Sequence, residues 1–274
     1  MSSDVIEWEK FGIEIALEAG RMMQEASGRN KNIETKCSPQ DLVTETDRGV
    51  EQFLFGEIKK RYPDHETIGE ESSDVKKPWT DVPTWIIDPV DGTMNFVHTF
   101  PFCCVSIGVT YKKEPVLAIV YSPFLDKLFT AKKGQGAFCN GKPMKVRPCK
   151  GLSEALVLSE LGSGREEERI NAVCQNVKSV MWKCHGMRGL GSAALNICYV
   201  ASGYADVYFE FGLHIWDMVA ASLILQEAGG VVCDTKNCGP LDLMSRRILA
   251  SGTQQVAAEV SATLPVHLEL ERDD

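Results

Sequence analysis

The segment at residues 84–96, TWIIDPVDGTMNF, constrains the fold and the chemistry of this chain more than any other. Its first four residues are apolar or β-branched, which predicts a short buried strand that ends at Asp88. Pro89 has no N–H to donate to a strand ladder, so we expect a turn there and a helix after Asp91. Two carboxylates would then lie beside free backbone N–H groups. Carboxylates bind hard divalent cations and free N–H groups bind phosphate, so the segment suits phosphoryl chemistry.

The charge balance narrows the possible partners of the chain. It has 274 residues and a net charge of −9, from 38 acidic and 29 basic residues, without a cluster of Lys or Arg. This composition argues against nucleic acid as a partner. An anionic substrate would need local positive charge, most simply from bound metal. The N-terminal sequence is acidic, no apolar run spans a membrane, and none of the 10 cysteines forms a C-x-x-C pair. These features predict a cytoplasmic protein with reduced thiols and no membrane association.

The first half of the chain combines helices with an antiparallel meander. Apolar periodicity predicts helices over residues 5–26 and after Asp47, which is a candidate N-cap. Lys36 falls on a short strand predicted over residues 32–37. Strand-like runs separated by turns then follow at 103–111, 116–121 and 127–131, and Asn140-Gly141 signals a hairpin turn.

Strands and helices alternate in the second half. Strands are expected at 155–160, 180–184, 205–210, 231–234 and 248–251, and helices at 165–178, 192–200, 216–228 and 253–263. The predicted fold class is therefore α/β, and in part α+β. We expect two closely joined halves, residues 1–148 and 149–274, in one compact unit.

For several polar residues the sequence allows two roles, capping a helix or binding a metal or ligand. Asp47 and Asp217 are each placed to cap a helix, and each also suits a metal site. Ser192 can cap the helix that follows it, and the small residues beside it would let a ligand approach the backbone. Glu70 and Glu71 are consecutive, so at most one is expected to reach a shared site if they lie on a strand.

Motifs along nearly the whole chain resemble the inositol monophosphatase family. They are LVTETD at 42–47, GEES ending at Ser72, WIIDPVDGTMNF from Trp85, GAFCNG at 136–141, ELG at 160–162, HGMRGLGSAA at 185–194, WDMVAASLILQEAGG from Trp216 and LMSRR at 243–247. The match is closest to the animal enzymes that act on myo-inositol monophosphates. The resemblance implies a layered α-β-α-β-α sugar-phosphatase fold and a homodimer.

The resemblance also implies Mg²⁺-dependent, lithium-sensitive hydrolysis of inositol phosphate monoesters by an activated water. Glu70, Asp88 and the Val90 carbonyl would hold one Mg²⁺, and Asp88, Asp91 and Asp217 a second. A third, weaker Mg²⁺ would contact Glu70 through waters. Such a set of carboxylates is consistent with bound metal, because clustered carboxylates repel one another unless cations neutralise them.

The remaining site residues are also implied by the resemblance. Catalytic roles fall to Glu70, Thr93 and Asp47, which would orient the attacking water, and Lys36 would lie near the site. Phosphate would bind at the turn that carries Thr93. The substrate contacts are expected at Asp91, Gly92, Thr93, Gly191, Ser192, Ala193, Glu210 and Asp217.

The sequence departs from the family pattern at two positions, and three alternative functions stay open. Met94 stands where the family often has a second Thr, and Val219 where a smaller residue is usual. Met94 bears on substrate preference, and galactose 1-phosphate is an alternative substrate. Related enzymes that act on bisphosphates carry extra basic residues, and the lack of a basic cluster here favours a monophosphate. A metal-binding scaffold without activity is the third alternative, and the intact acidic set argues against it.

Overall fold

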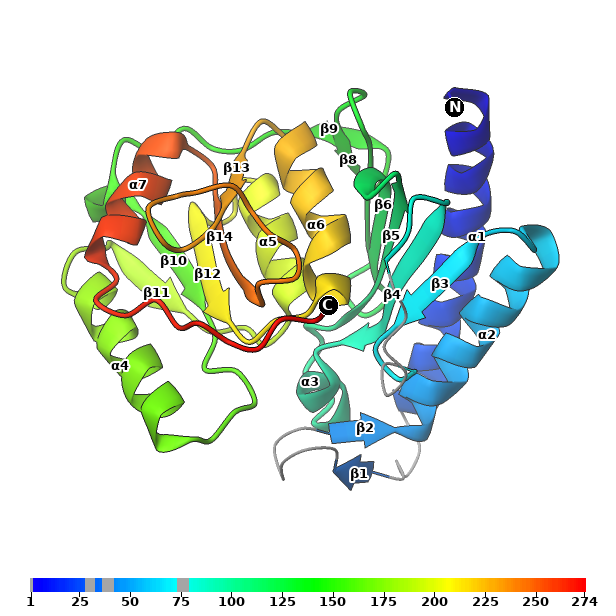
Figure 1. Cartoon of the computed structure of the whole chain (residues 1–274), viewed down its shortest axis with the longest axis horizontal. Coiled ribbons are helices and arrows are strands. Elements are labelled where there is room, and N and C mark those ends of the chain that lie inside the picture. Colours follow the sequence, from blue (N-terminus) through cyan, green and yellow to red (C-terminus); the bar gives the residue numbers. More distant parts are fainter. Residues whose placement is uncertain (1, 28–32, 36–41, 73–78) are drawn as a thin grey trace.

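Figure 1 shows the computed structural model of the chain, in which helices and sheets alternate in five layers. The structure describes residues 2–27, 33–35, 42–72 and 79–274. Lys36, which the sequence places on a strand, and residues 73–78 of the loop before β4 lie outside these ranges. Within the described residues, the order helix, sheet, helix, sheet, helix confirms the predicted layered fold.

The first sheet is a meander covered on its outer face by two helices. Those helices are α1 (Ser2–Ser27) and α2 (Glu45–Arg61). The strands lie in chain order: β3 (Glu66–Gly69), β4 (Thr84–Asp91), β5 (Cys104–Tyr111), β6 (Glu114–Ser122), β7 (Lys127–Lys132), β8 (Ala137–Cys139) and β9 (Lys142–Met144). All neighbours are antiparallel except β3 and β4. Asn140 and Gly141 both have positive φ, 49° and 73°, as the predicted tight hairpin between β8 and β9 requires.

The second sheet is mixed and lies across the molecule from the first (Figure 1). Its order is β11-β10-β12-β14-β13, with β10 parallel to both of its neighbours. The strands are β10 (Leu156–Ser159), β11 (Gly186–Arg188), β12 (Val207–Phe211), β13 (Val231–Cys233) and β14 (Arg247–Ser251). Helices α4 (Glu167–Met181) and α7 (Gln254–Thr263) cover its outer face.

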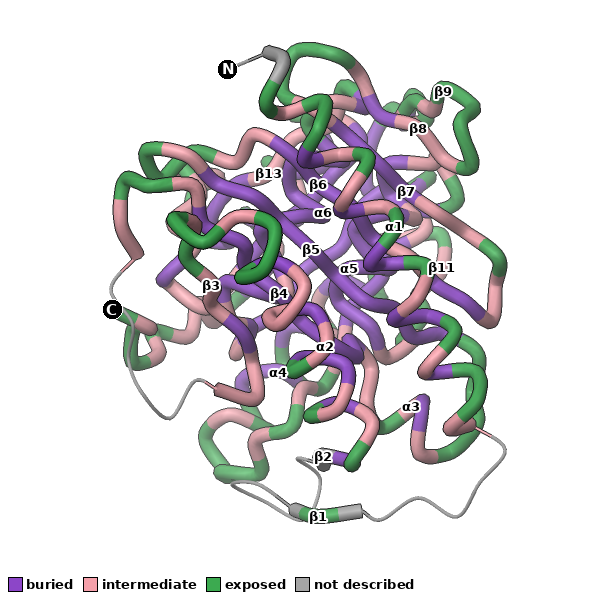
Figure 2. Tube along the Cα trace, turned by 90° about the vertical axis from the view of Figure 1, so that its right-hand side faces the viewer, coloured by how far each residue is buried: buried purple, intermediate pink, exposed green. Residues whose placement is uncertain are grey.

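The middle layer consists of α5 (Ala193–Ala201) and α6 (Ile215–Glu227). Helix α6 packs on β4 to β8 of the first sheet and also contacts β13 and β14 of the second. This position explains its sequence, because a helix between two sheets must be apolar nearly all round. Figure 2 shows α6 buried along with the central strands. None of the helices in the described part of the chain combines the length and the apolar character that a bilayer span requires.

The prediction that the first strand of the key segment ends at Asp88 is wrong. Strand β4 continues to Asp91, and all eight of its residues are buried. The register against β5 shifts between Asp88 and Asp91, which marks a bulge at Pro89. Because ladder bonding is interrupted there, the missing N–H of Pro89 costs no strand pairing. The helix that the sequence predicts next is present as α3 (Thr93–Val97).

The strand predicted over residues 180–184 is also wrong. Helix α4 continues to Met181, and the strand that follows is β11. Val173, Asn176 and Val180 are buried at helical spacing, so the β-branched Val180 completes the apolar stripe of the helix. Tertiary packing overrides its local preference for a strand.

Asp47 is not the N-cap of its helix. Thr44, in the small strand β2 (Leu42–Thr44) that pairs with β1 (Ile33–Thr35), holds that position, and α2 begins at Glu45. Asp47 is the third residue of the helix and completes a capping box, because its Oδ2 accepts a hydrogen bond from the Thr44 N–H at 3.0 Å. Only one oxygen of Asp47 is needed for this cap, so the other can act elsewhere.

Candidate active site

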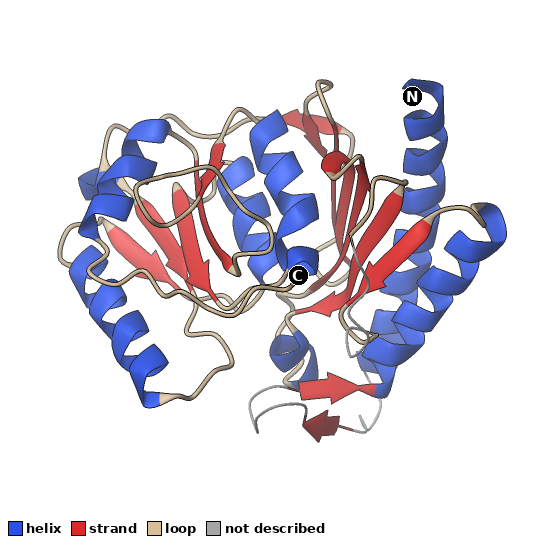
Figure 3. Cartoon of the chain, viewed as in Figure 1, coloured by secondary structure: helices blue, strands red, loops and turns tan. Residues whose placement is uncertain are grey.

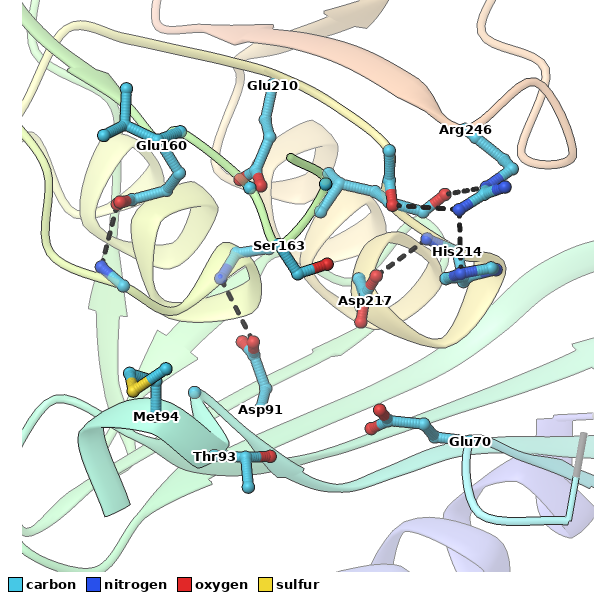
Figure 4. Close-up of a pocket in the computed structure, with 18 of the residues that line it drawn as sticks. Glu70, Asp91, Thr93, Met94, Glu160, Ser163, Glu210, His214, Asp217 and Arg246 are labelled. Carbon is cyan, nitrogen blue, oxygen red and sulfur yellow. Dashed lines mark hydrogen bonds between the residues drawn. The ribbon is translucent and has the colours of Figure 1, made fainter. Parts of the chain in front are cut away.

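Three carboxylates from distant parts of the chain meet in one pocket. Asp88 and Asp91 come from the end of β4, and Asp217 from the first turn of α6. One oxygen from each lies within 4.8 Å of the others. Figure 4 shows Asp91, Thr93 and Glu70 on one wall and Asp217, Glu210 and Arg246 on the facing wall. An all-carboxylate group of this size matches the ligand preference of a hard divalent cation.

The bulge at Pro89 explains how Asp88 and Asp91 reach the same site. In a regular strand, residues three positions apart point to opposite faces. One extra residue in the strand restores a common face, and the Asp88 Oδ1 accepts the Val90 N–H at 2.9 Å within the bulge. Gly92 then has φ 91°, and a Cβ there would lie 2.9 Å from the Gly191 carbonyl oxygen. Only glycine fits this approach.

Asp91 connects the first half of the chain to α5. Its carboxylate accepts hydrogen bonds from the Ser192 hydroxyl at 2.6 Å, the Ala194 N–H at 2.7 Å and the Ala193 N–H at 3.2 Å. Ser192 is also the predicted N-cap of α5, because its Oγ accepts from the Leu195 N–H at 3.3 Å. The predicted substrate-binding segment therefore has a structural role against Asp91.

Asp217 and Asp47 occupy equivalent positions in their helices. Asp217 is the third residue of α6, and its Oδ2 accepts the His214 N–H at 2.7 Å. The His214 ring stacks on Trp216 with centroids 4.7 Å apart and contacts Asp273 through Nδ1 at 2.8 Å. These contacts fix the start of α6 and with it the direction of the Asp217 carboxylate.

Asp47 does not line the pocket but supports a residue that does. The Thr93 Oγ1 donates toward the Asp47 Oδ1 at 3.0 Å and lies 3.0 Å from the Val90 carbonyl oxygen. Asp47 is fully buried, and burial raises the pKa of its carboxyl group while the hydrogen bond from Thr44 opposes the rise. The pair Asp47–Thr93 therefore forms a fixed polar support beneath the cluster.

Burial and mutual repulsion disfavour charge on the three carboxylates. Burial, then the charges of Glu70, Asp91 and Asp217, raises the pKa of Asp88 well above its ordinary value. Burial and the charge of Asp217 raise the pKa of Asp91 to about 7. Burial raises the pKa of Asp217 to about 6 against the opposing effect of His214. The interaction between Asp88 and Asp217 further raises the pKa of Asp88 and opposes the rise in the pKa of Asp217.

The first prediction concerns pH and metal. An acid whose pKa is raised in the folded state stabilises the metal-free protein at low pH, and this stability is lost as pH rises from about 4 through the folded values, about 6 and about 7. A divalent cation binds the ionised cluster, so its stabilising effect should grow over the same range. Thermal melting from pH 5 to 8, with chelator or with Mg²⁺, measures the shift. A Mg²⁺-induced shift that is constant with pH would contradict the assignment.

The pocket has a volume of about 1280 Å³ and contains all the predicted site residues except Asp47. The predicted residues that line it are Glu70, Asp88, Val90, Asp91, Gly92, Thr93, Gly191, Ser192, Ala193, Glu210 and Asp217. Glu70 lies outside the group of three carboxylates, but its charge raises the pKa values of Asp47, Asp88 and Asp217. Met94 also lines the pocket and is 38% exposed.

Sequence reasoning gave no role to Glu160, which organises the wall of the pocket formed by residues 190–196. Its Oε1 accepts from the Leu190 N–H at 2.7 Å, and from the Gly191 N–H and the Asn196 side chain at 2.8 Å. The motif ELG contains Glu160, yet its partners lie 30 or more residues away. The buried Glu210 is its neighbour, and burial followed by the Glu160 charge raises the pKa of Glu210 well above its ordinary value.

Arginines line the pocket although the sequence contains no cluster of Lys or Arg. Arg48, Arg165, Arg169 and Arg246 line the same pocket as the carboxylates. They come from α2, from the loop before α4, from α4 and from the turn before β14. Because these four positions are distributed along the chain, the sequence contains no local run of Lys and Arg from which the group could be predicted.

Comparison with known proteins agrees with the fold and the motifs. The model of the inositol monophosphatase family matches residues 4–268. Inositol monophosphatase 1 of Sus scrofa is 45% identical over 267 residues, which cover 96% of each chain. The structure of the extragenic suppressor protein suhB from Bartonella henselae superposes with a TM-score of 0.85, at 30% identity over 94% of this chain and 98% of that one. Inositol monophosphatase from Anabaena gives a TM-score of 0.82 at 31% identity, with 98% of both chains covered. The chain therefore belongs to the inositol monophosphatase family.

Proposed function

We propose that the protein hydrolyses inositol monophosphates, myo-inositol 1-phosphate and its isomers, to inositol and phosphate in a Mg²⁺-dependent reaction. The observation that carries the proposal is the convergence of Asp88, Asp91 and Asp217, with oxygens within 4.8 Å of one another in a large pocket. Membership of the family supplies the reaction class and the substrate. The proposal includes inhibition by Li⁺, which the family resemblance implies.

The donor set fits magnesium, which binds hard oxygen ligands. We assign Glu70, Asp88 and the Val90 carbonyl to one ion and Asp88, Asp91 and Asp217 to a second, with a third, weaker ion near Glu70. When bound, such ions lower the pKa of a water molecule and stabilise charge on the attacking and leaving oxygens. Asp88 belongs to both sets, so its position at the bulge of β4 sets the spacing of the whole site.

The protein's own groups position the water and the phosphate. The Thr93 Oγ1 accepts a hydrogen bond from the water, and the hydroxyl is held in this direction because it donates to Asp47. Glu70 lies on the same wall as Thr93 (Figure 4) and is assigned to orient the same water. Gly92 and Thr93 present backbone N–H groups that have no acceptor within α3, and these bind the phosphate oxygens.

A second prediction tests the Thr93 hydroxyl. Replacing Thr93 with Ala removes the group that orients the water but no metal ligand, so kcat should fall by roughly a hundredfold with little change in KM. Steady-state phosphate release measures both constants. Thr80→Ala, which removes a hydroxyl that bonds Glu66 outside the pocket, is the matched control. A normal kcat in the Thr93 variant would remove this hydroxyl from the mechanism.

The polyol is assigned to the facing wall of the pocket. Gly191, Ser192 and Ala193 form a backbone surface that a ring can approach closely, and Asp91 and Asp217 complete the contacts. Glu210 is held by a hydrogen bond from the Tyr208 hydroxyl, and its raised pKa favours the protonated carboxyl. A protonated carboxyl both donates and accepts hydrogen bonds, which suits the hydroxyls of a polyol.

A substrate comparison tests the proposal. Turnover of myo-inositol 1-phosphate should exceed that of galactose 1-phosphate, with Mg²⁺ present and purified protein. Preference for galactose 1-phosphate would favour the broader sugar monophosphatase, since the sugar ring presents similar hydroxyls. The absence of turnover on either compound would favour a metal-binding scaffold without activity.

We further propose that residues 1–148 and 149–274 act as one compact unit, a homodimer in the cytoplasm. The hydrogen bonds that the Ser192 hydroxyl and the Ala194 N–H donate to Asp91 tie the two halves together at the site. Nine cysteines in the described part of the chain are free thiols, which suits a reducing compartment. Light scattering should give twice the chain mass of 30.3 kDa, and a monomer mass would refute the dimer.

A further inference from the structure

Three arginines form a basic wall in the pocket, and the proposed chemistry uses none of them. Arg169 Nη2 donates to the Phe211 carbonyl oxygen at 2.9 Å. Arg246 donates to the next two carbonyls of the same turn, those of Gly212 and Leu213, at 3.4 and 3.3 Å. Arg165 donates to two carbonyls of the loop at residues 162–164, both at 2.9 Å. Two adjacent loops therefore hold the guanidinium groups beside the polyol wall.

The Arg169 side chain lies in a cradle made of glycines. A Cβ on Gly162, Gly164 or Gly212 would lie 2.8, 2.5 or 1.8 Å from a nitrogen of its guanidinium group. Any other residue at these positions would displace the side chain. The guanidinium is thus fixed against bare backbone, and less conformational entropy remains to be lost when it binds a ligand.

Most donors of Arg169 are unused. Its Nε is buried without a hydrogen-bond partner, and no carboxylate in the described part of the chain comes within ion-pair distance of the group. A guanidinium offers five N–H donors, and among the described residues only the Phe211 carbonyl accepts one. Burying half of a cation whose donors are unpaired costs folding free energy unless an anion binds it.

Both basic and acidic groups surround Arg169. Burial lowers the pKa of Arg169, Glu166 opposes this, and the charges of Arg246 and Arg165 lower it further. The acids that face the group are the exposed Glu166 and the buried Glu210, whose raised pKa favours its neutral form. Asp273 lies 3.7 Å from Arg246 and offsets part of its charge. Because Glu160, Glu168 and Glu269 also line the pocket, the unused donors of Arg169 favour an anion more than the sum of the charges does.

We propose that Arg169, with Arg165 and Arg246, forms a second phosphoryl-binding subsite, which holds a non-reacting phosphoryl group on the polyol while the first is hydrolysed. The planar fork of arginine matches the oxygens of a phosphoryl dianion. The carboxylates and the three arginines line one pocket of about 1280 Å³, so a single ligand with two phosphoryl groups is assigned to both. The inference rests on the proposed phosphatase function and names a further substrate class for it.

The test compares myo-inositol 1,4-bisphosphate with myo-inositol 1-phosphate in the Mg²⁺-loaded wild-type protein and in Arg169→Gln. The ratio of the bisphosphate KM to the monophosphate KM should rise by roughly tenfold or more, because a charge-assisted hydrogen bond is lost. The kcat ratio should not change, since the subsite is remote from the reacting phosphorus. Arg169→Lys keeps the charge without the fork and should give an intermediate ratio. Arg61→Gln on α2 is the matched surface control, expected to leave the ratio at its wild-type value.

Two further readouts separate the possible results. Inorganic phosphate is assayed as an inhibitor. If Arg169→Gln weakens phosphate inhibition by the same factor as it raises the bisphosphate KM, the subsite binds free phosphate and not a second phosphoryl group of the substrate. Calorimetry measures binding of the bisphosphate without turnover. If the protein proves not to be a phosphatase but the subsite exists, the bisphosphate should still bind more weakly to Arg169→Gln than to the wild type. Equal KM ratios, equal phosphate inhibition and equal bisphosphate binding in the two proteins would overturn the proposal.

Discussion

Replacing Asp88 with Asn should lower phosphate release from myo-inositol 1-phosphate by about a thousandfold or more. Asp88 is the one carboxylate assigned to both metal ions, so its loss weakens both. Metal stabilisation of transition-state charge is worth several kcal/mol, and about 1.4 kcal/mol corresponds to a factor of ten in rate. Steady-state phosphate release at saturating Mg²⁺ measures the effect. Near-normal turnover would contradict the shared role of Asp88.

The same substitution should not damage the fold. Without metal, burial and the charges of Glu70, Asp91 and Asp217 raise the pKa of Asp88, which favours its protonated form. An asparagine has the shape of the protonated acid, can donate to Asp217 and keeps the oxygen that accepts from Val90. The metal-free variant should therefore melt at the wild-type temperature or above. Asp64→Asn, in the turn after α2, is the control for loss of one carboxylate elsewhere. A large drop in melting temperature would show that Asp88 is a structural residue.

Replacing Asp217 with Asn should lower activity by roughly a hundredfold or more. Asp217 is assigned only to the second ion, so one metal set stays complete and the expected loss is smaller than for Asp88. The apparent Mg²⁺ requirement should rise at the same time. Phosphate release measured over a Mg²⁺ titration gives both quantities. Unchanged Mg²⁺ dependence together with normal turnover would remove Asp217 from the metal site.

Asp217 also stabilises the start of α6, and the control must account for that role. Its Oδ2 accepts the His214 N–H at 2.7 Å, and Asn retains an oxygen acceptor there. The change removes a negative charge from the first helical turn, which by itself costs about 0.3–1 kcal/mol, but it also relieves the burial and repulsion that raise the pKa of Asp217 to about 6. Glu167→Gln removes the equivalent charge from the first turn of α4 and is the matched control. The metal-free Asp217→Asn variant should melt no lower than Glu167→Gln, and only Asp217→Asn should lose activity.

The sequence predicts the elements of the site better than the way they meet. A β-branched run before two carboxylates and a glycine predicted a buried strand and a following helix, and both are present. The bulge that places Asp88 and Asp91 on a common face was not predicted, because a proline at position 89 predicts a turn that ends the strand. Strand pairing on both sides of β4 favours the bulge, and this information is not local.

The substrate wall was predicted less completely for a similar reason. Ser192 was predicted as a helix cap, and it is one, but its hydroxyl also donates to Asp91 across 101 positions. Glu160 and the arginines of the basic wall depend on contacts between loops that are distant in sequence. The family resemblance implied the set of carboxylates, and Asp88, Asp91 and Asp217 each lie near the start or end of a regular element. Residues that act through loop contacts carry no such periodic signal.

Phosphate release from myo-inositol 1-phosphate by the purified wild-type protein, measured over a Mg²⁺ titration, tests the central claim most directly. Asp88, Asp91 and Asp217 form a site that suits divalent cations, so release should be absent in chelator and should rise with Mg²⁺. The concentration of Mg²⁺ needed should fall as pH rises through about 6 to about 7, where Asp217 and Asp91 ionise. Release that is unaffected by chelator, or no release at saturating Mg²⁺, would contradict the account.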